Sequence, residues 1–445
     1  MTEVTLLRGG YVLTLDDELG EIPDADVLLI DGGIAEVGVD LQAPEGADEV
    51  DCRGMLVMPG FIDTHQHLWN SFFRGLTTGV GERAYFPVKR RLAALVTADD
   101  TAAATLAALW ESAASGITSV VDWHHNLRSP DYAEATAAAH RVSGLRTRLA
   151  YGNPDAWDAT RTADLDDLER WASAGVGPLS DLGLAVRGPT RSEPAVLAAE
   201  WEAAARLGLP MTMHMGGRRS DVDRYADLRA MDSAGLLVPA LQVVHAVDAD
   251  EEELRLLAHR GVSISLSPAT ELGSMGAPPI VAALDAGVQL SLSTDSLALP
   301  ARADMFEQMR TVVRLGNARG GAPVTPRTAL SLATREGARD LGWDHVVGRV
   351  RPGLRADIVV VDARRLGFAV ALDPVLSLVM ACGVEDVHHV LVDGRWVKRG
   401  GVDLTGLDAA RARSHAALRA LLARAGWAVG GTGEGDVAVA GQGTE

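Results

Sequence analysis

The sequence predicts an α/β protein: a (β/α)8 TIM barrel with a small β-sandwich domain formed from both chain ends. Short apolar runs alternate with longer Ala/Leu-rich stretches from about residue 58 to residue 347, as the strands and helices of a barrel do. Both ends of the chain carry β-rich runs separated by Gly/Asp turns instead. A chain of 445 residues has room for one large barrel and a satellite domain.

The β-rich ends begin with residues 4–57, where runs such as Val27-Leu28-Leu29-Ile30 precede turns such as Asp31-Gly32-Gly33. The same pattern returns at 356–362 and 390–397, so we expect the two ends to meet in one domain. The predicted division is a β-sandwich from 1–57 and 348–402, a barrel at 58–347, a C-terminal helix at 403–429 and a flexible tail at 430–445.

Eight apolar runs are the predicted barrel strands: 61–64, 117–122, 146–151, 184–187, 211–214, 242–245, 263–267 and 289–294. Helical stretches such as 98–115 and 193–207 separate them. Glycines stand just before several of these runs, where loops from helix to strand commonly use a C-cap glycine: Gly116, Gly144, Gly208, Gly261 and Gly287.

Composition limits the functional class. A formal net charge of −19 at pH 7 argues against binding nucleic acid or an anionic membrane, because phosphates need a basic partner. No apolar run approaches the roughly 20 residues that span a bilayer, and no signal peptide is visible, so we expect a cytoplasmic protein. Two cysteines, Cys52 and Cys382, are too few for a disulfide framework. The only lysines are Lys89 and Lys398.

Histidines stand where several predicted strands end. His65 and His67 follow the first strand, and because residues i and i+2 of a strand share a face, both imidazoles can approach one point. His214, His245 and Asp295 end predicted strands 5, 6 and 8. Barrel active sites lie at the C-terminal strand ends, so the set indicates a site for a divalent metal such as zinc or iron. Taken singly, a histidine can cap a strand harmlessly, and Asp295 can be a helix N-cap.

Five segments carry a family resemblance: Pro59-Gly60-Phe61-Ile62-Asp63-Thr64-His65-Gln66-His67, His214, Val244-His245, Ser293-Thr294-Asp295 and Gly353-Leu354-Arg355-Ala356-Asp357-Ile358-Val359. Together they resemble the amidohydrolase superfamily, in the branch of cytosine deaminase, the adenosine-analogue deaminases and the triazine hydrolases. The resemblance covers about residues 4–400. It implies a barrel with metal held by His65, His67, His214 and Asp295, and with His245 near the metal-bound water.

The resemblance also implies a metal count and a mechanism. Binuclear members bridge two metals with a carbamylated lysine at the end of strand 4, but here that strand ends Val186-Arg187-Gly188-Pro189. We therefore expect one divalent metal per chain, zinc in the first place and iron as the alternative. The metal lowers the pKa of bound water from 15.7 towards roughly 7, giving a hydroxide nucleophile. Asp295 is then the expected proton shuttle, and His245 polarises the substrate.

One departure from the family pattern concerns strand 5. Deaminases of this branch place a glutamate three residues after the strand-5 histidine, whereas this segment reads His214-Met215-Gly216-Gly217. The chain resembles a subgroup without that glutamate, which indicates no particular substrate. The matching stretches are Val121-Asp122-Trp123-His124-His125-Asn126, Val186-Arg187-Gly188-Pro189, His214-Met215-Gly216 and Glu271-Leu272-Gly273-Ser274-Met275-Gly276.

Other residues near the strand ends are candidates for substrate binding. His125 and Glu271 are candidates to replace the missing acid, against structural alternatives as a loop residue and a loop cap. Arg187 is a candidate partner of a substrate anion or of a local carboxylate. Aromatic residues of the long connection after strand 1 suit closure over a ligand or simple packing. The full set of candidates is Trp69, Arg74, Trp123, His125, Arg187 and Glu271.

The sequence thus predicts a mononuclear metal-dependent hydrolase of a C–N bond, other than a peptide bond, in a small nitrogen-rich heterocyclic or amidine-like molecule. Deaminase-like displacement is the leading reaction. One alternative uses the same metal site for dehalogenation, ring opening, or lyase or decarboxylase chemistry. The other alternative is a catalytically silent relative that binds a ligand. The expected partners are a small-molecule substrate and further copies of the chain in a homodimer or higher homo-oligomer, without nucleic acid or membrane.

Overall fold

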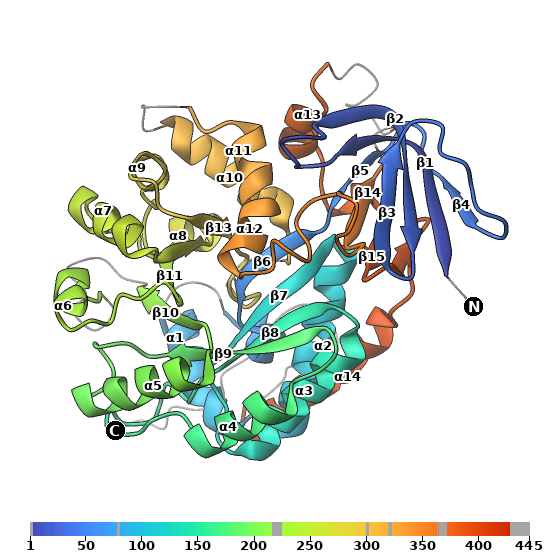
Figure 1. The fold of residues 1–445 in the computed structure, drawn as a ribbon. Coiled ribbons are helices and arrows are strands. Elements are labelled where there is room, and N and C mark those ends of the chain that lie inside the picture. Colours follow the sequence, from blue (N-terminus) through green and yellow to red (C-terminus); the bar gives the residue numbers. More distant parts are fainter. Residues whose placement is uncertain are drawn as a thin grey trace.

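The computed structural model describes residues 3–77, 81–215, 225–299, 302–318, 323–362, 364 and 372–427. Its strands form two sheets, which occupy separate regions of the molecule (Figure 1). One sheet has eight parallel strands in sequence order, and the other is a mixed sheet of nine strands from both chain ends. The predicted fold class, a barrel with a smaller β domain made from both ends, is confirmed.

The eight barrel strands are β6 (Phe61–Gln66), β7 (Ile117–His124), β8 (Arg146–Tyr151), β9 (Ser180–Val186), β10 (Met211–Met215), β11 (Leu241–His245), β12 (Ser263–Leu266) and β13 (Leu290–Leu292). Each predicted run overlaps one of them. The fourth strand starts four residues earlier than the apolar run at 184–187, because the polar Ser180 and Asp181 pair with Thr147 and Arg148 of the third strand.

Helices follow the barrel strands and lie around the sheet (Figure 1). They are α1 (Tyr85–Leu92), α2 (Ala98–Ala114), α3 (Pro130–Ser143), α4 (Leu165–Ala174), α5 (Pro194–Leu207), α6 (Leu228–Ser233), α7 (Glu251–Arg260), α8 (Pro268–Ser274), α9 (Ile280–Asp285), α10 (Met305–Ala318), α11 (Pro326–Leu332) and α12 (Arg335–Asp340), with short 3-10 turns η1 (Leu68–Phe73), η2 (Gly81–Arg83) and η3 (Ala93–Leu95).

Local signals explain where these helices begin and end. Thr97 and Asp250 form capping boxes at the starts of α2 and α7, which satisfy backbone N–H groups that lack helical partners. Left-handed glycines end α3, α5 and α7: φ is 71° at Gly144, 65° at Gly208 and 70° at Gly261. The predicted C-cap glycines are confirmed at these three positions. Glycine suits them because it alone adopts this conformation without a Cβ penalty.

The barrel closes where its first and last strands meet. The backbone N–H of Asp295 donates to the carbonyl of His65 at 3.0 Å, and Gln66 forms a parallel bridge with Asp295. The carboxylate of Asp63 accepts the backbone N–H of Thr294 at 3.1 Å and also its hydroxyl. The seam between β6 and the segment after β13 therefore includes two residues of the predicted metal site, His65 and Asp295.

Strands from both chain ends make the second sheet: β1 (Val4–Leu13), β2 (Glu21–Ile30), β3 (Gly33–Gly38), β4 (Asp48–Asp51), β5 (Leu56–Pro59), β14 (Ile358–Val361), β15 (Val387–Val392), β16 (Arg395–Arg399) and β17 (Val402–Asp403). β5 joins the two halves, since it pairs with β1 on one side and β14 on the other. Arg146 of the barrel holds Asp357 beside this sheet through two hydrogen bonds of 3.0 and 3.1 Å.

Two further helices, α13 (Pro374–Ala381) and α14 (Leu407–Arg424), follow in the C-terminal part of the chain. α14 covers the long connection after β6: Trp69, Phe73 and Leu92 share an apolar cluster with Leu421 and Trp427. The predicted flexible tail at 430–445 lies outside the described residues. None of the described helices is long and apolar enough to cross a membrane.

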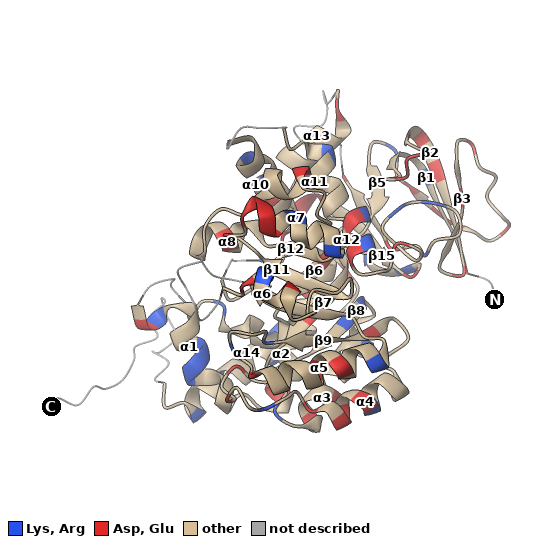
Figure 2. Ribbon diagram, turned by 60° about the vertical axis from the view of Figure 1, so that its left-hand side comes forward, with Lys and Arg blue, Asp and Glu red and all other residues tan. Residues whose placement is uncertain are grey.

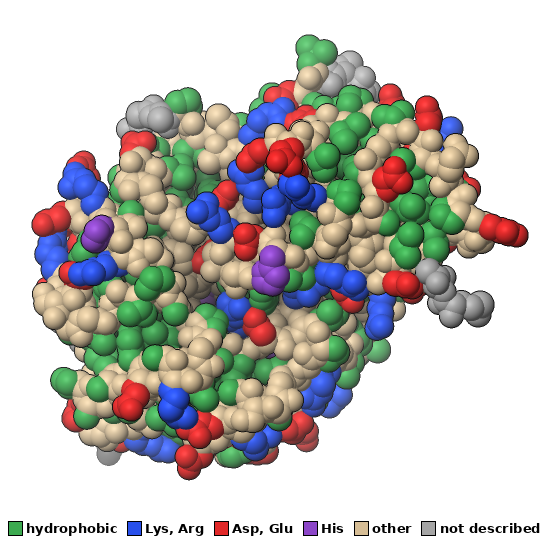
Figure 3. All heavy atoms as spheres, in the orientation of Figure 1, with side chains coloured by type: hydrophobic (Ala, Val, Ile, Leu, Met, Phe, Trp, Pro, Cys, Tyr) green, Lys and Arg blue, Asp and Glu red, His purple; other side chains and the backbone are tan. Residues whose placement is uncertain are grey.

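Charged side chains of both signs are interspersed over the face shown in Figure 3. The two cysteines, Cys52 and Cys382, are both free and buried, as expected for a chain without disulfides. Burial raises the pKa of Cys52 to about 12, so its thiol stays neutral at ordinary pH.

Candidate metal centre and active site

Five side chains converge at the C-terminal ends of the barrel strands. Ligand atoms of two overlapping trios lie within 4.8 Å of one another: His65, His214 and His245, and His65, His67 and Asp295. Oδ1 of Asp295 lies 3.5 Å from Nε2 of His65 and 3.4 Å from Nε2 of His67. The rings of His67 and His214 are stacked, with centroids 5.2 Å apart. The structure thus brings the whole set together around one point.

The donor chemistry of this group fits a divalent transition metal. Nδ1 of His67 bonds the Trp123 carbonyl at 2.9 Å and therefore carries the proton, which leaves Nε2 free to act as a ligand. Neither ring nitrogen of the fully buried His65 has a hydrogen-bond partner among the described residues. Burying such groups is costly unless a ligand satisfies them. Imidazoles with one carboxylate are ordinary zinc ligands.

The histidines have the protonation state that metal binding needs. Burial lowers the pKa of His67 to about 3 and shifts the pKa values of His65 and His214 in the same direction. All three imidazoles are therefore neutral near pH 7. Burial opposes ionisation of Asp295, but the surrounding histidines outweigh it and hold the pKa of this carboxyl below its usual range.

Glu271 lies behind His245. Its Oε1 is 3.1 Å from Nδ1 of His245 and accepts the backbone N–H of Ser267 at 2.8 Å. Burial works against a charged His245, but the hydrogen bond to Glu271 outweighs it and raises the pKa of the imidazole above its ordinary value. Glu271 therefore orients His245 and leaves Nε2 as the nitrogen available to the site. It does not line the cavity, and it is an internal residue of α8.

The backbone at two of these positions is left-handed. φ is 77° at His245, 51° at the next residue, Ala246, and 60° at Asp295. Such conformations cost of order 1–3 kcal/mol for residues other than glycine and cluster at functional sites. Asp295 is not a helix N-cap, since α10 begins only at Met305.

A cavity of about 480 Å³ opens over the site, and four of the five side chains line it: His67, His214, His245 and Asp295. Three of the predicted substrate-binding residues line it: Trp123, His125 and Arg187. Trp123 packs edge-on against His214, with ring centroids 4.2 Å apart. The side chain of Arg187 donates to the carbonyls of Trp157, Asp158 and Arg161 at 2.7 to 3.0 Å. This arginine thus pins the loop after β8 and makes no ion pair with a carboxylate of the described part.

Two further candidates, Trp69 and Arg74, belong to the connection after β6 and do not line the cavity. Trp69 is fully buried and directs its Nε1 towards Nδ1 of His125 at 3.4 Å. Arg74 forms a two-pronged ion pair with Glu111, with both N–O distances 3.0 Å, and donates to the carbonyl of Leu297. Both contacts support the packing of the connection.

The sequence analysis missed a charged cluster in the cavity wall. Lys89 comes from α1, whose basic residues are visible in Figure 2, and its ammonium pairs with Asp155 and lies 3.2 Å from Nε2 of His125. Arg191 reaches the other oxygen of Asp155 at 3.2 Å. The one usable signal was the rarity of lysine in this chain. Nothing in the spacing predicts that α1 turns Lys89 back into the barrel mouth.

Hydroxyl groups fill the barrel interior below the metal site. Thr64 contacts Ser265 and Ser291 at 2.8 Å, and Ser293 contacts Ser265 at 2.9 Å and Ser267 at 2.7 Å. Barrel cores usually contain bulky branched side chains, so this polar layer is unusual for the fold.

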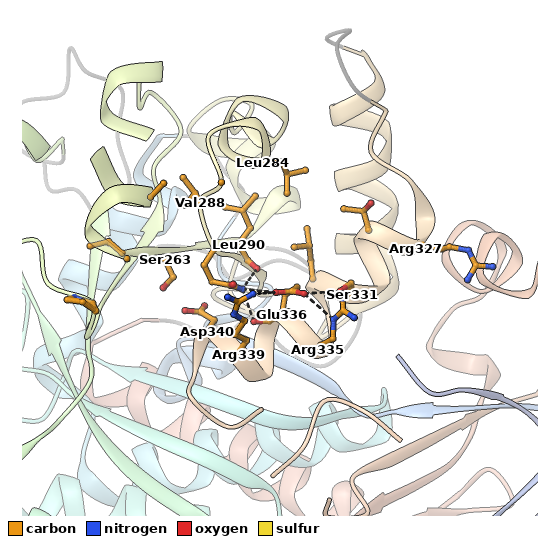
Figure 4. Close-up of a pocket in the computed structure, with 18 residues that line it drawn as sticks. Ser263, Leu284, Val288, Leu290, Arg327, Ser331, Arg335, Glu336, Arg339 and Asp340 are labelled. Atoms are coloured by element: carbon orange, nitrogen blue, oxygen red, sulfur yellow. Dashed lines mark hydrogen bonds and ion pairs between the residues drawn. The ribbon is translucent and has the colours of Figure 1, made fainter. Parts of the chain in front are cut away.

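A second cavity, of about 790 Å³, lies at the opposite, N-terminal ends of β12 and β13 (Figure 4). Its charged groups are largely paired: Arg335 bonds Glu336 at 3.1 Å, and Arg339 lies 3.9 Å from the same carboxylate. Asp340, also in its wall, accepts from Gln242 and Ser291. None of the five converging residues lines this cavity, so the smaller one holds the active-site candidate.

The fold and this site define a metal-dependent hydrolase of the amidohydrolase type. The model of the Amidohydrolase family matches residues 56–397, and the chain belongs to that family. The predicted enzyme class, a hydrolase acting on C–N bonds other than peptide bonds, is thereby confirmed.

Two deaminases are similar to this chain over most of its length. The chain is 30% identical over 445 residues to a 5-methylthioadenosine/S-adenosylhomocysteine deaminase of Haloarcula marismortui, covering 95% of this chain and 99% of that protein. It is 29% identical over 410 residues to a 5'-deoxyadenosine deaminase of Methanosarcina mazei, covering 88% and 91%.

Among solved structures, the fold matches a zinc-bound adenosine deaminase from Xanthomonas campestris with a TM-score of 0.84, at 23% identity and covering 94% of this chain and 98% of that chain. It also matches atrazine chlorohydrolase from Arthrobacter aurescens complexed with zinc, with a TM-score of 0.82, at 24% identity and covering 93% and 100%.

Proposed function

We propose that this chain is a mononuclear zinc-dependent deaminase that hydrolyses a C–N bond of a purine-like heterocycle. The observation that carries the proposal is the convergence of four histidines and Asp295 on one point of a cavity. The names of the relatives, deaminases of adenosine analogues, support the substrate class. Two observations favour one ion over two. No lysine stands at the end of β9, and the ammonium of Lys89 is already engaged by Asp155 and His125.

In this proposal His65, His67, His214 and Asp295 hold the ion. Zinc bound by such a set acts as a Lewis acid and makes a coordinated water a nucleophile near neutral pH. Asp295, which is ionised, accepts the proton of the attacking water and returns it to the leaving amino group. Glu271 accepts Nδ1–H of His245 and favours the protonated imidazole, which donates a hydrogen bond from Nε2 to the substrate as negative charge develops.

The missing strand-5 glutamate bears on the substrate rather than on the metal. Position 217 is glycine and lies outside the described residues. Because no carboxylic acid is available there, His245 supplies the hydrogen bond to the substrate in this proposal. Heterocycles that can be attacked with a hydrogen bond from His245 alone are therefore better substrates than those whose ring must also be protonated by a carboxylic acid.

The experiment is a zinc determination followed by product analysis. Purified protein, loaded with zinc, is incubated with adenosine, 5'-deoxyadenosine and related heterocyclic amines, and free ammonia is measured. About one zinc per chain with release of ammonia supports the proposal. Release of chloride from halogenated heterocycles without ammonia from amines would replace it with dehalogenation, and no product from either series would indicate a silent relative.

A further inference from the structure

The wall of the active-site cavity carries an excess of positive charge. Apart from Asp295 of the metal centre, the formally charged side chains that line it among the described residues are Lys89, Arg187 and Arg191 against one carboxylate, Asp155. This balance is opposite to that of the whole chain, whose formal net charge is −19. A local reversal of charge in a cavity concentrates ligands of the opposite sign.

Asp155 assembles the cluster without neutralising it. One carboxylate oxygen holds the ammonium of Lys89, and the other holds the guanidinium of Arg191 at 3.2 Å. Lys89 and Arg191 come from α1 and from the loop after β9, so a single carboxylate joins two separate parts of the barrel mouth. The trio keeps a net charge of one positive unit.

Arg187 adds a further positive charge beside the trio. The residue is 6% exposed, and its terminal nitrogens are bonded to neutral carbonyls, which leave its charge uncompensated. Its Nε is buried and has no partner among the described residues, while Glu200, Asp155 and Asp158 act on it only at longer range. A buried cation without a paired carboxylate is stabilised when an anion enters the cavity.

The cluster has spare hydrogen-bond donors. Lys89 uses two of its three ammonium donors, towards Asp155 and His125, and its side chain is 9% exposed. Arg191 makes one side-chain contact in the described part, to Asp155, and its side chain is 38% exposed. Donors therefore extend from the buried Lys89 to the rim of the cavity, suited to an oxygen-rich group that lies along this wall.

His125 lies between the cluster and the proposed metal ligands. Nζ of Lys89 lies 3.2 Å from Nε2 of His125, whose ring centroid is 4.4 Å from that of His67. A group bound at Lys89 therefore lies next to the reaction centre without contacting the proposed metal ligands. Trp123 and Phe86 line the same cavity and offer apolar surface for the heterocyclic ring of the substrate.

We infer that the substrate carries an anionic oxygen group, a carboxylate or a phosphate, bound by Lys89 and Arg191 on the cavity wall beside His125. The inference rests on the proposed function for the position of the reaction centre. The anion site adds a specificity determinant to the proposed function, because a neutral heterocycle leaves the cationic wall without a counter-charge.

The test measures binding of three matched probes to the zinc-loaded full-length chain by calorimetry: adenosine, adenosine 5'-carboxylic acid and adenosine 5'-monophosphate. At least one anion is expected to bind about tenfold more tightly than adenosine, and this preference should decline as ionic strength rises. The tighter of the two anions identifies the group as carboxylate or phosphate. Equal affinities, or no measurable binding of either anion, would overturn the inference.

Three variants locate the effect. Arg191→Gln is expected to reduce the anion-to-adenosine affinity ratio, and Asp155→Asn to increase it, because the competing carboxylate is removed. Arg206→Gln, an arginine with a half-exposed side chain on α5, is the matched control and should keep the wild-type ratio. An unchanged ratio in Arg191→Gln would refute an anion site on this wall. Ammonia release without anion preference would overturn this inference alone.

Discussion

Nδ1 of His245 lies 3.1 Å from Oε1 of Glu271, and both side chains are almost completely enclosed. The same oxygen accepts the backbone N–H of Ser267, so the carboxylate is fixed by the start of α8. The backbone of His245 is left-handed, a conformation that is costly for residues other than glycine and persists only where the surrounding structure fixes it. The orientation of the imidazole is therefore set from both its backbone and its far ring nitrogen.

Removing the carboxylate should loosen that orientation. Glu271→Ala is expected to lower kcat/KM for ammonia release by about 10–100-fold, the usual loss when a group supporting a histidine of a metal site is removed. Glu271→Gln should lose less, because its amide oxygen can still accept from Nδ1. Glu252→Ala, at an exposed position of α7, is the control. An unchanged rate in Glu271→Ala would contradict the positioning role.

Asp295→Asn tests the proton shuttle. Asparagine tolerates the left-handed backbone found here and keeps one oxygen ligand, so much of the zinc should remain bound. Turnover should fall by about 10²–10⁴-fold, because the amide cannot carry the proton of the attacking water. Zinc analysis and initial rates on the same preparation separate the two effects. Substantial residual turnover would remove Asp295 as the proton carrier.

Metal removal should cost stability as well as activity. A ligand that binds only the folded chain stabilises it by RT ln(1 + [L]/Kd), about 2.7 kcal/mol at 100 times Kd. We expect a chelator to lower Tm, and zinc to restore it with a stoichiometry close to one per chain. Titration of the thermal shift against zinc measures both quantities. A metal content close to two per chain would contradict a mononuclear site.

Asp155 should make stability depend on pH. Burial opposes ionisation of Asp155, but Lys89 and His125 outweigh it, and its pKa lies well below the usual range. A carboxyl with a lowered folded pKa contributes stability that is complete above its unfolded pKa, about 3.9, and is lost as pH falls below it. Asp155→Asn should therefore reduce the free energy of unfolding by about 1–3 kcal/mol at pH 7. In urea titrations, the difference from wild type should shrink in acid; a constant difference would argue against an ionic contribution.

The two thiols should be inert in the folded chain. Burial raises the pKa of Cys52 to about 12 and shifts that of Cys382 upwards, so both lack the reactive thiolate near pH 8. A thiol-specific reagent should label neither cysteine in the native protein and both after denaturation. Rapid native labelling at pH 8 would show that one of these side chains is accessible.

The barrel and the metal site were predictable because their signals are local. Alternating apolar runs place the strands, and His65 and His67 share one strand face, so the C-terminal strand ends bring their side chains to the other histidines. The role of Glu271 was not predictable, since a glutamate four residues after Ser267 gives no sign that α8 turns it behind His245 rather than into the cavity. For Arg187, the sequence suggested a substrate anion or a local carboxylate as partner, and its partners within the protein are backbone carbonyls rather than a carboxylate. Such partners belong to a loop whose path depends on tertiary packing.

The seam of the barrel has a consequence for how the protein is made. Asp63 and Thr294, which bond across it, are 231 residues apart in the chain. During synthesis, the first pair of histidines emerges long before Asp295, and the ion cannot be fully enclosed until the last barrel strand has been added. Complete enclosure of the metal therefore has to wait for the last barrel strand, while the C-terminal strands of the second sheet are still to be made. A truncated chain that ends before β13 would keep most of its strands and still be unable to retain the ion.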